Sequence, residues 1–308
     1  PATTIYVNPA ANTSYAVQFT TSTTPCTTTP RVIPVAVGVP MTLTAPATVA
    51  ACIGSGFTLT ASHAAIPATN AAPVYLWQQS ADGGVNWSSI SGATGITLTV
   101  PTTTADMNGR RYRLLSQSGG CAIAVSNTSV LTVNPLPTVS LAAPATSLIP
   151  GRTVTITGTS SPAAATSGWS WSLNGATIAG ATATQIVNID GLGSYQATVR
   201  DVNGCVNRSN VLAIGGEASD KLFIYPNPTA GAFQVRYYHA GDVNEKRTIS
   251  VYNPLGQLVA VKSFDLTYST APYLRMDVDM SGAARGTYVV KVAHEYSGKI
   301  VSGLVLVQ

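Results

Sequence analysis

A three-part unit recurs along the first two thirds of this chain and constrains the fold more than any other feature. Each copy has a short apolar segment that begins at a Tyr, a turn that carries a Cys, and a second apolar segment. The copies begin at Tyr15, Tyr112 and Tyr195, so they are 97 and 83 residues apart. This spacing is the length of one small β-sandwich. The repeat therefore predicts several β-sandwiches in tandem.

The front half of the unit also repeats. Residues 56–61 and 151–157 alternate apolar and small polar side chains, which is the period expected of a half-buried strand. A Trp follows each of these strands, Trp77 in one copy and the Trp169 and Trp171 pair in the next. An aromatic at this place is typical of the buried centre of an immunoglobulin-like sandwich. The predicted fold class is therefore all-β, with tandem immunoglobulin-like β-sandwiches followed by a small C-terminal β-sandwich.

Charge is sparse and changes along the chain. Only 9% of the 308 residues are charged, 45% are hydrophobic, and the net charge is +4. Lys and Arg form no runs, which excludes a typical nucleic-acid-binding surface. No apolar run approaches the roughly 18 residues of a membrane helix. Every Lys lies after residue 220, so the change in composition predicts a domain boundary near a Gly-rich linker.

These patterns predict five parts. The first copy of the repeat has no front half, so we expect the chain to be the C-terminal piece of something larger. An incomplete sandwich exposes strand edges, which pair readily with other strands. Upstream sequence or a neighbouring chain is expected to complete it. The parts are the C-terminal half of a truncated immunoglobulin-like domain (1–41), an immunoglobulin-like domain (42–135), an immunoglobulin-like or PKD-like domain (136–215), a linker (216–220) and a C-terminal domain (221–308).

Three sequence blocks define the C-terminal domain. They are YPNPTAGAF at 225–233, VYNPLGQLV at 251–259, and GTYVVKV at 286–292 followed by SGKIVSGLVLV at 297–307. The prolines around Asn227 prevent helix and favour extended backbone. Gly231 permits a turn into an alternating strand, and the Asn-Pro-Leu-Gly segment predicts a hairpin. About seven short strands are expected to form a compact sandwich.

The three blocks resemble the type A C-terminal sorting domain of the type IX secretion system of Bacteroidota. Residues 1–215 resemble the bacterial immunoglobulin-like and PKD-like domains of large surface proteins. The resemblance implies a secreted or cell-surface protein that contacts an outer-membrane translocon, a shuttle protein and a sortase, with attachment to lipopolysaccharide. Pro254 replaces a more usual turn residue of the family. The family motif falls on Pro226, Asn227, Pro228, Gly231, Gly256, Gln257, Gly286 and Lys299.

Four cysteines lie far apart, without a CxxC pair or a neighbouring His. This spacing favours disulfides over a zinc site. The related surface domains imply a bridge between Cys52 and Cys121. In that frame Cys205 has no partner, and Cys26 pairs with a residue ahead of Pro1. Free thiols in turns and crosslinks between chains remain the alternatives for Cys26 and Cys205.

The sequence contains few residues that could carry out catalysis. The three histidines are His63, His239 and His294, and no GxSxG motif is present. We expect His63 in a surface loop, and we predict no catalytic residues, no cofactor and no metal. Residues 201–204 resemble half of a Ca²⁺ loop but lack its further carboxylates. Asp277 and Asp279 alternate along one strand and predict a solvated face.

Exposed aromatics are the remaining candidates for ligand contact. Trp87 follows a hairpin turn at Asp82-Gly83-Gly84, and it or one of Trp169 and Trp171 could face outward, because alternate strand residues point to opposite faces. Stacking on carbohydrate and burial in the core are the two interpretations, and burial is favoured.

The sequence thus predicts a non-enzymatic cell-surface or secreted protein that serves as an adhesin, stalk or structural element. One alternative is the C-terminal portion of a larger secreted enzyme with its catalytic domain upstream. Another is a self-assembling fibre or sheath subunit, with homo-assembly through the truncated N-terminal sandwich.

Overall fold

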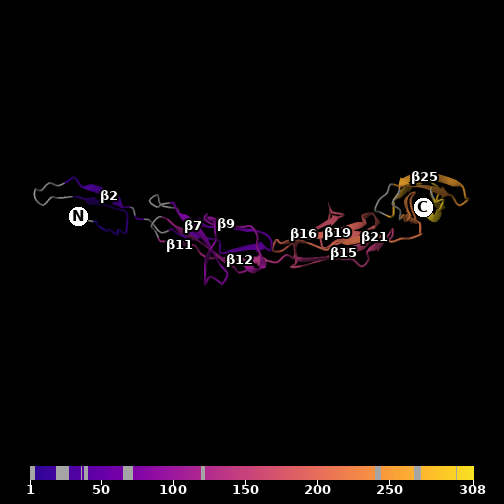
Figure 1. Ribbon diagram of the computed structural model, residues 1–308. Coiled ribbons are helices and arrows are strands. Elements are labelled where there is room, and N and C mark those ends of the chain that lie inside the picture. The colour runs from indigo at the N-terminus through magenta and orange to yellow at the C-terminus, as the bar shows by residue number, and fades with distance from the viewer. Residues whose placement is uncertain are drawn as a thin grey trace, which may run out of the picture. The chain divides into compact units, whose positions relative to one another are not determined.

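The computed structural model describes residues 4–18, 28–35, 37, 41–64, 72–118, 122–239, 244–266, 272–295 and 297–308. Within these ranges every regular element is a β-strand except two 3-10 turns, η1 (Ala105–Met107) and η2 (Ile189–Gly191). They contain no helix with the length and apolar character needed to cross a membrane. The chain divides into an N-terminal unit, residues 1–136, and a C-terminal unit, residues 137–308, each described here by itself (Figure 1). The all-β prediction is confirmed.

The N-terminal unit begins with an isolated hairpin. Strands β1 (Thr13–Val17) and β2 (Arg31–Val35) pair antiparallel, with Tyr15 opposite Ile33. Val32 is 62% exposed and Ile33 is 44% exposed, so this hairpin buries little apolar surface within the described residues. Cys26, in the segment between the two strands, lies outside the described residues.

The first sandwich, β3 to β12, packs two small sheets against a larger one. The larger sheet has the order β4-β12-β10-β7-β8, with β11 paired to β10, and the small sheets are β3-β6 and β5-β9. Leu59 and Leu98 from one side meet Trp77 and Leu114 from the other in one buried cluster. The strands are β3 (Leu43–Thr44), β4 (Thr48–Cys52), β5 (Phe57–Thr60), β6 (Ser62–His63), β7 (Val74–Ser80), β8 (Ser88–Ser89), β9 (Thr97–Val100), β10 (Arg111–Gln117), β11 (Ala124–Val125) and β12 (Ser129–Asn134).

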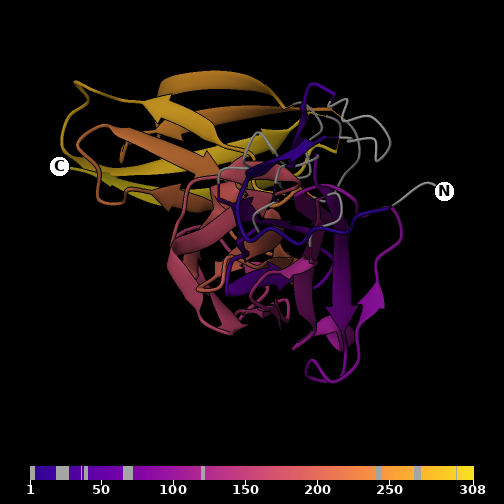
Figure 2. The same ribbon diagram turned by 90° about the vertical axis from the view of Figure 1, so that its left-hand side faces the viewer.

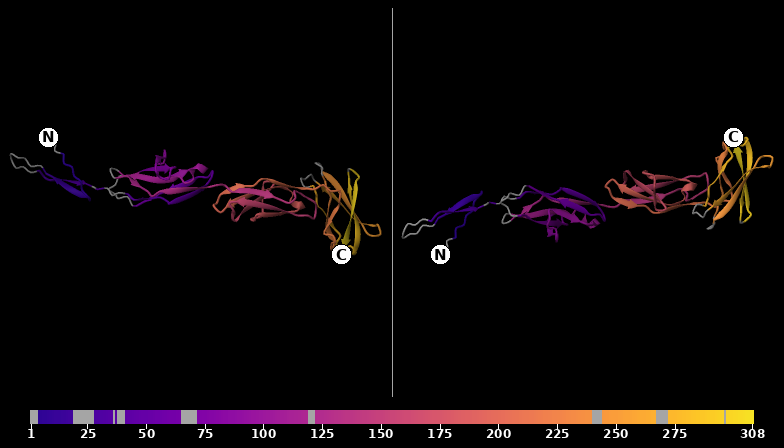
Figure 3. Two further views of the ribbon diagram at one scale, coloured as in Figure 1. Left: turned by 90° about the horizontal axis from the view of Figure 1, so that it is seen from below. Right: turned by 90° about the horizontal axis from the view of Figure 1, so that it is seen from above.

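The second sandwich, β13 to β21, repeats this plan in the C-terminal unit (Figure 3). One sheet is β13-β15-β18, and the other is β14-β21-β19-β16-β17 with β20 paired to β19. The strands are β13 (Thr138–Ala142), β14 (Ser147–Leu148), β15 (Val154–Ser161), β16 (Ala164–Leu173), β17 (Ala176–Ile178), β18 (Thr184–Val187), β19 (Gly193–Asp201), β20 (Val206–Arg208) and β21 (Leu212–Gly216).

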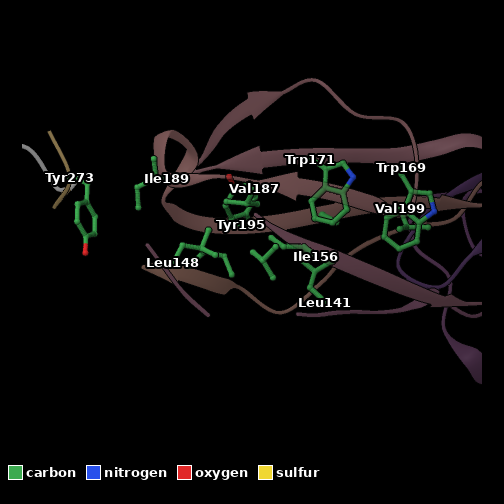
Figure 4. Packing of buried hydrophobic residues seen from close by; sticks show 13 residues of the cluster. Leu141, Leu148, Ile156, Trp169, Trp171, Val187, Ile189, Tyr195, Val199 and Tyr273 are labelled. Atoms are coloured by element: carbon green, nitrogen blue, oxygen red, sulfur yellow. The ribbon is translucent and has the colours of Figure 1, made fainter. Parts of the chain in front are cut away.

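Aromatic side chains fill the space between these two sheets. Figure 4 shows Trp171, Tyr195 and Ile156 gathered in the core. The Trp171 ring nitrogen donates to the carbonyl of Thr182 at 2.9 Å, so its polar atom is satisfied although the ring is 1% exposed. The Tyr195 hydroxyl likewise donates to the carbonyl of Gly191. The core is therefore mainly apolar, and the polar atoms of its Trp171 and Tyr195 rings are paired.

For Trp169 and Trp171 the favoured interpretation, burial in the core, is confirmed, and neither ring faces outward. Both are buried, and their rings stack with centroids 6.2 Å apart. Residues two apart on a strand point to the same face, which explains the outcome. Trp87 is half-buried and carries the Arg113 guanidinium 4.1 Å from its ring centroid. Its hairpin turn, between β7 and β8, forms as predicted.

The segment predicted as a flexible linker is partly fixed. Gly216 ends β21 and pairs with Leu148, and the Glu217 amide donates to the Leu148 carbonyl at 2.8 Å. The Tyr273 hydroxyl donates to the Glu217 carbonyl at 2.6 Å. Backbone hydrogen bonding thus continues the strand one residue beyond the predicted boundary at 215.

The tail domain, β22 to β28, is a sandwich of seven strands, as expected (Figure 2). A three-stranded sheet, β22-β23-β26, packs on a four-stranded sheet, β25-β24-β27-β28. Val235 and Met276 from the first sheet meet Val290 and Val305 from the second in one core. The strands are β22 (Phe223–Tyr225), β23 (Ala232–Arg236), β24 (Glu245–Tyr252), β25 (Leu258–Leu266), β26 (Met276–Asp279), β27 (Gly286–His294) and β28 (Ile300–Val307).

Candidate functional site

The Asn227 side chain covers the outer edge of the last strand. Strand β28 lies at the edge of its sheet, so half of its backbone groups have no neighbouring strand. The Asn227 amide donates to the Leu304 carbonyl at 2.8 Å, and its oxygen accepts from the Leu306 amide at 3.0 Å. Thr229 continues the contact, since its amide donates to the Leu306 carbonyl at 2.8 Å. The first sequence block therefore completes the edge of β28.

The prolines and the glycine of this block fix its path. The peptide bonds before Pro226 and Pro228 are both cis, and both prolines are exposed. Gly231 has a φ of +131°, and a Cβ there would lie 2.9 Å from the Cα of Ser281. Only glycine allows this close approach, which brings the Gly231 carbonyl to the Met280 amide at 3.1 Å.

The second block forms a turn that its own side chains hold. The Asn253 carboxamide oxygen accepts from the amides of Leu255 at 3.0 Å and Gln257 at 2.9 Å. Its nitrogen donates to the Gln257 side chain at 2.8 Å, and Gly256 supplies the positive φ of +79°. Pro254 takes no part in these hydrogen bonds, so its presence does not disturb the turn.

Register shows which motif residues share one end of the four-stranded sheet. Gly286 pairs with Val307, and Val307 bridges to Thr229, so the first and third blocks meet there. A Cβ on Gly286 would be 3.9 Å from the ring of Pro254, which brings the second block to the same place. We call this the motif end. Seven of the eight predicted motif residues, all but Lys299, lie in these three segments.

Lys299 lies at the opposite end, in the turn between β27 and β28. Its ammonium is 3.4 Å from the Asp220 carboxylate and 5.5 Å from the Tyr237 ring centroid. Hydrogen bonding to the Tyr237 hydroxyl, and then the negative charge of Asp220, raises the pKa of Lys299. The side chain is 56% exposed, so the ion pair is screened and contributes little stability.

A shallow pocket of about 300 Å³ adjoins the first block, between Tyr225, Pro226 and β26. Asp277 and Asp279 line it and are exposed, which confirms the predicted solvated face. The Asp277 carboxylate accepts from Arg275 at 2.7 Å, and its carbonyl accepts from the Lys262 ammonium at 2.9 Å. Arg275 and Asp277 therefore form an ion pair in this pocket, whereas the Asp279 carboxylate accepts from Ser281.

Two histidines and a glutamate converge at the end of the sheet that contains Lys299, called here the histidine end. Glu245 begins β24, His294 ends β27, and His239 follows β23. His239 Nδ1 is 2.7 Å from Glu245 Oε2, and His294 Nε2 is 2.9 Å from Glu245 Oε1. One donor atom from each residue lies within 4.8 Å of the others. Two imidazoles and a carboxylate are a ligand set for a divalent transition metal.

Arg247 adjoins this cluster and is as deeply buried as Glu245. Its Nε donates to Glu245 Oε1, and another guanidinium nitrogen donates to the Tyr237 carbonyl at 3.0 Å. The side chains of Arg247 and Glu245 are only 1% and 2% exposed. A buried carboxylate requires such pairing, because an uncompensated charge in the interior is strongly unfavourable.

The sequence analysis predicted no metal and did not connect these residues. His239 and His294 are 55 positions apart, and neither stands in a ligand spacing with Glu245. Glu245 and His294 come together because Arg247 pairs with His294 across β24 and β27, whereas His239 reaches them from the other sheet, after β23. Only the register of the paired strands could have indicated this cluster, and the hydrophobic pattern of the sequence does not determine that register.

The sandwiches contain fewer groups of chemical interest. Asp201 is buried, and one carboxylate oxygen accepts from the amides of Asn203 at 2.9 Å and Cys205 at 2.8 Å. This carboxylate closes a turn within residues 201–205. His63 lies on the short strand β6 instead of a loop, and its ring is 6.3 Å from that of Tyr75.

Cys52 and Cys205 each take part in a disulfide bond. The expectation that Cys205 has no partner is therefore wrong, and its side chain is 1% exposed. Cys121 lies outside the described residues, so its bridge to Cys52 stays a prediction. Non-reducing peptide mapping decides the pairing.

Two parts of the chain match known protein families. Residues 223–306 match the family described as "Secretion system C-terminal sorting domain", and residues 42–135 match the family described as "Domain of unknown function (DUF8696)". No curated protein matches the chain.

Solved structures that resemble the chain do so weakly. Murine CEACAM1b matches at 16% identity and a TM-score of 0.30, over 58% of this chain and 100% of that one. A marsupial T cell receptor matches at 14% identity and a TM-score of 0.36, over 85% of this chain and 98% of that one. Dimeric latent PorU from Porphyromonas gingivalis matches at 12% identity and a TM-score of 0.24, over 87% of this chain and 34% of that one. At these TM-scores the likenesses add nothing to the architecture already described.

The tail of this chain matches the C-terminal sorting domains of the type IX secretion system. Such a tail marks a secreted or cell-surface protein and implies interaction with the secretion machinery.

Proposed function

We propose that this chain is a non-enzymatic surface or secreted protein, whose sandwiches serve as a stalk, structural element or adhesin and whose tail directs type IX export. The family match of residues 223–306 carries the export part of the proposal. The motif residues support it physically, because seven of the eight lie in segments that meet at one exposed end of the tail domain.

The non-enzymatic part rests on what the sandwiches contain. Their buried polar side chains are hydroxyls of Ser and Thr, apart from Asp201, whose carboxylate holds a turn. In the part of the chain that the structure describes, the only group of three metal-ligating side chains lies in the tail. A catalytic site needs a nucleophile, base or metal in mutual reach. The sandwiches thus suit mechanical spacing and surface contact.

Export tests the role of the motif end. The chain, preceded by a signal peptide, is expressed in a bacterium with a working type IX system, and the protein outside the outer membrane is measured. Asn227→Ala removes both side-chain hydrogen bonds to β28, so we expect the exported fraction to fall at least about tenfold. Asn86→Ala, at an exposed turn of the first sandwich, is the matched control. Normal export of the Asn227 variant, with the control unchanged, would contradict the role of this residue.

We further propose that a sortase removes the tail and joins the upstream chain to lipopolysaccharide. Residues 217–222 have no regular secondary structure between β21 and β22, which makes this the place for cleavage. Mass spectrometry of protein from intact cells should find a chain that ends near Gly216, with an added lipopolysaccharide fragment. A tail that stays attached in surface protein would contradict this step.

Homo-assembly through the N-terminal hairpin is a separate proposal. Ile5 and Tyr6 are 71% and 92% exposed, and Val32 and Ile33 of β2 add further apolar surface. Exposed apolar strands pair with other strands. Sedimentation velocity of the chain should show oligomers that Val32→Asp reduces. Monomers alone at high concentration would exclude self-assembly of this chain.

A further inference from the structure

We propose that His239, Glu245 and His294 form a binding site for one Zn²⁺-like divalent transition-metal ion at the histidine end of the tail domain. The ligands would be His239 Nδ1, His294 Nε2 and a carboxylate oxygen of Glu245. The site is distinct from the motif end, where most residues of the sorting motif meet.

The three donor atoms are already close enough for one ion. Ligand nitrogen and oxygen atoms lie about 2.0–2.2 Å from zinc, so two ligands of a tetrahedral ion are about 3.4 Å apart. The atoms of the cluster all lie within 4.8 Å of one another, and the two histidine contacts to Glu245 are 2.7 and 2.9 Å. Small side-chain rotations would therefore place an ion among them without moving the strands.

The carboxylate is not satisfied by hydrogen bonds alone. Glu245 Oε2 is fully buried and makes no hydrogen bond of acceptable geometry, although His239 Nδ1 is 2.7 Å away. Such an atom is costly to bury unless something else compensates its charge. Arg247 pairs with the other oxygen, Oε1, so a cation among the three ligands would give Oε2 a partner of its own, which is the second and independent indication of a ligand.

The donor set selects the metal. Two imidazole nitrogens and one carboxylate favour Zn²⁺, Co²⁺ and similar ions, whereas Ca²⁺ and Mg²⁺ require mainly oxygen ligands. Three protein ligands leave a position for water. Arg247 holds Glu245 Oε1 from outside the cluster, as outer partners of metal-bound carboxylates do. Its positive charge opposes a second cation nearby, so we expect moderate affinity.

An ion here would connect three segments that the fold brings together only at this point. His239 follows β23, the central strand of one sheet, and Glu245 and His294 lie on neighbouring strands of the other. The His294 amide also donates to the Lys299 carbonyl at 3.0 Å, which closes the turn into β28. Metal binding would thus stabilise the final hairpin in proportion to the free ion concentration.

The chain offers a matched control, because it has three histidines and His63 lies in the other unit. The full chain is kept oxidised, any free thiols are alkylated, and it is titrated with ZnCl₂ in a calorimeter at pH 7.5. We expect one zinc per chain. His239→Gln and His294→Gln should weaken binding at least about a hundredfold, since even the loss of an outer partner costs 10- to 100-fold. His63→Gln should bind as the unchanged chain does.

Two further measurements keep the test decisive. Co²⁺ bound to the unchanged chain should give the visible absorption of a four-coordinate site, and His239→Gln should abolish it. If His294→Gln does not fold by circular dichroism, His239→Gln decides, since His239 lies outside the regular strands. No zinc binding, binding that survives His239→Gln, or equal loss in His63→Gln would overturn the proposal.

Discussion

The interiors of the two sandwiches differ in kind from the interior of the tail domain. The sandwiches pack aromatic and aliphatic side chains, and their buried polar groups are hydroxyls together with Asp201. The tail buries Arg236, Glu245 and Arg247 and brings two histidines to the same carboxylate. Among the described residues, the buried charged side chains other than Asp201 therefore lie in the tail domain.

Removal of a core aromatic side chain from a sandwich is expected to have the largest effect on stability. Trp171→Ala should lower the free energy of unfolding by about 3–5 kcal/mol, because it leaves a large cavity in an apolar core. Trp77→Ala should cost a similar amount in the first sandwich. Urea unfolding measures both. Trp87→Ala, at the half-buried position under Arg113, should cost about 1 kcal/mol or less. An equal cost at all three positions would show that the cores are not where stability resides.

The second prediction concerns the buried charge of the tail. Glu245→Gln keeps the shape of the side chain but removes the charge that pairs with Arg247, and should cost about 2–3 kcal/mol in metal-free buffer. Urea unfolding with a chelator present measures it. Glu295→Gln is the nearby control and should change stability by less than about 0.5 kcal/mol, since that side chain is exposed. A variant at position 245 that matches its control would remove the contrast between the two interiors.

A third test separates the covered edge of β28 from the rest of the tail. Asn227→Ala removes two side-chain hydrogen bonds to this strand, which should cost about 1–2 kcal/mol. Hydrogen exchange should show faster exchange of the Leu306 amide, which Asn227 binds at 3.0 Å. The Val305 amide, on the same strand, should exchange as before. Unchanged exchange at Leu306 would contradict the proposed covering of the edge.

The smallest expected effect lies where the tail meets the second sandwich. Tyr273→Phe removes the hydrogen bond to the Glu217 carbonyl and should cost about 1 kcal/mol. Burial raises the pKa of Tyr273 to about 12 from its ordinary 10.0. Because the raised pKa belongs to the folded state, this stability is complete below pH 10 and is lost as pH rises toward 12. Denaturation curves against pH should show that loss, and the Phe variant should show less of it.

Local patterns were sufficient to predict most of the fold. Alternation gave the strands β5, β15 and β23, and Gly and Asn gave the turns at residues 82–84 and 253–256, because these depend on neighbours in sequence. The contact of Asn227 with Leu304 spans 77 residues, and the meeting of Glu245 with His294 depends on how β24 pairs with β27. Such contacts follow from register, which hydrophobic alternation alone does not determine.

Deletion of whole domains tests whether the tail domain, and not the first sandwich, directs export. One variant lacks residues 42–135, which form the first sandwich, and the other lacks residues 221–308. In a host with a working type IX system, the fraction of each protein found outside the cell is measured against the full chain. We predict near-normal export without the first sandwich and export reduced to background without the tail. Export that persists without residues 221–308, or that fails without residues 42–135, would contradict the account.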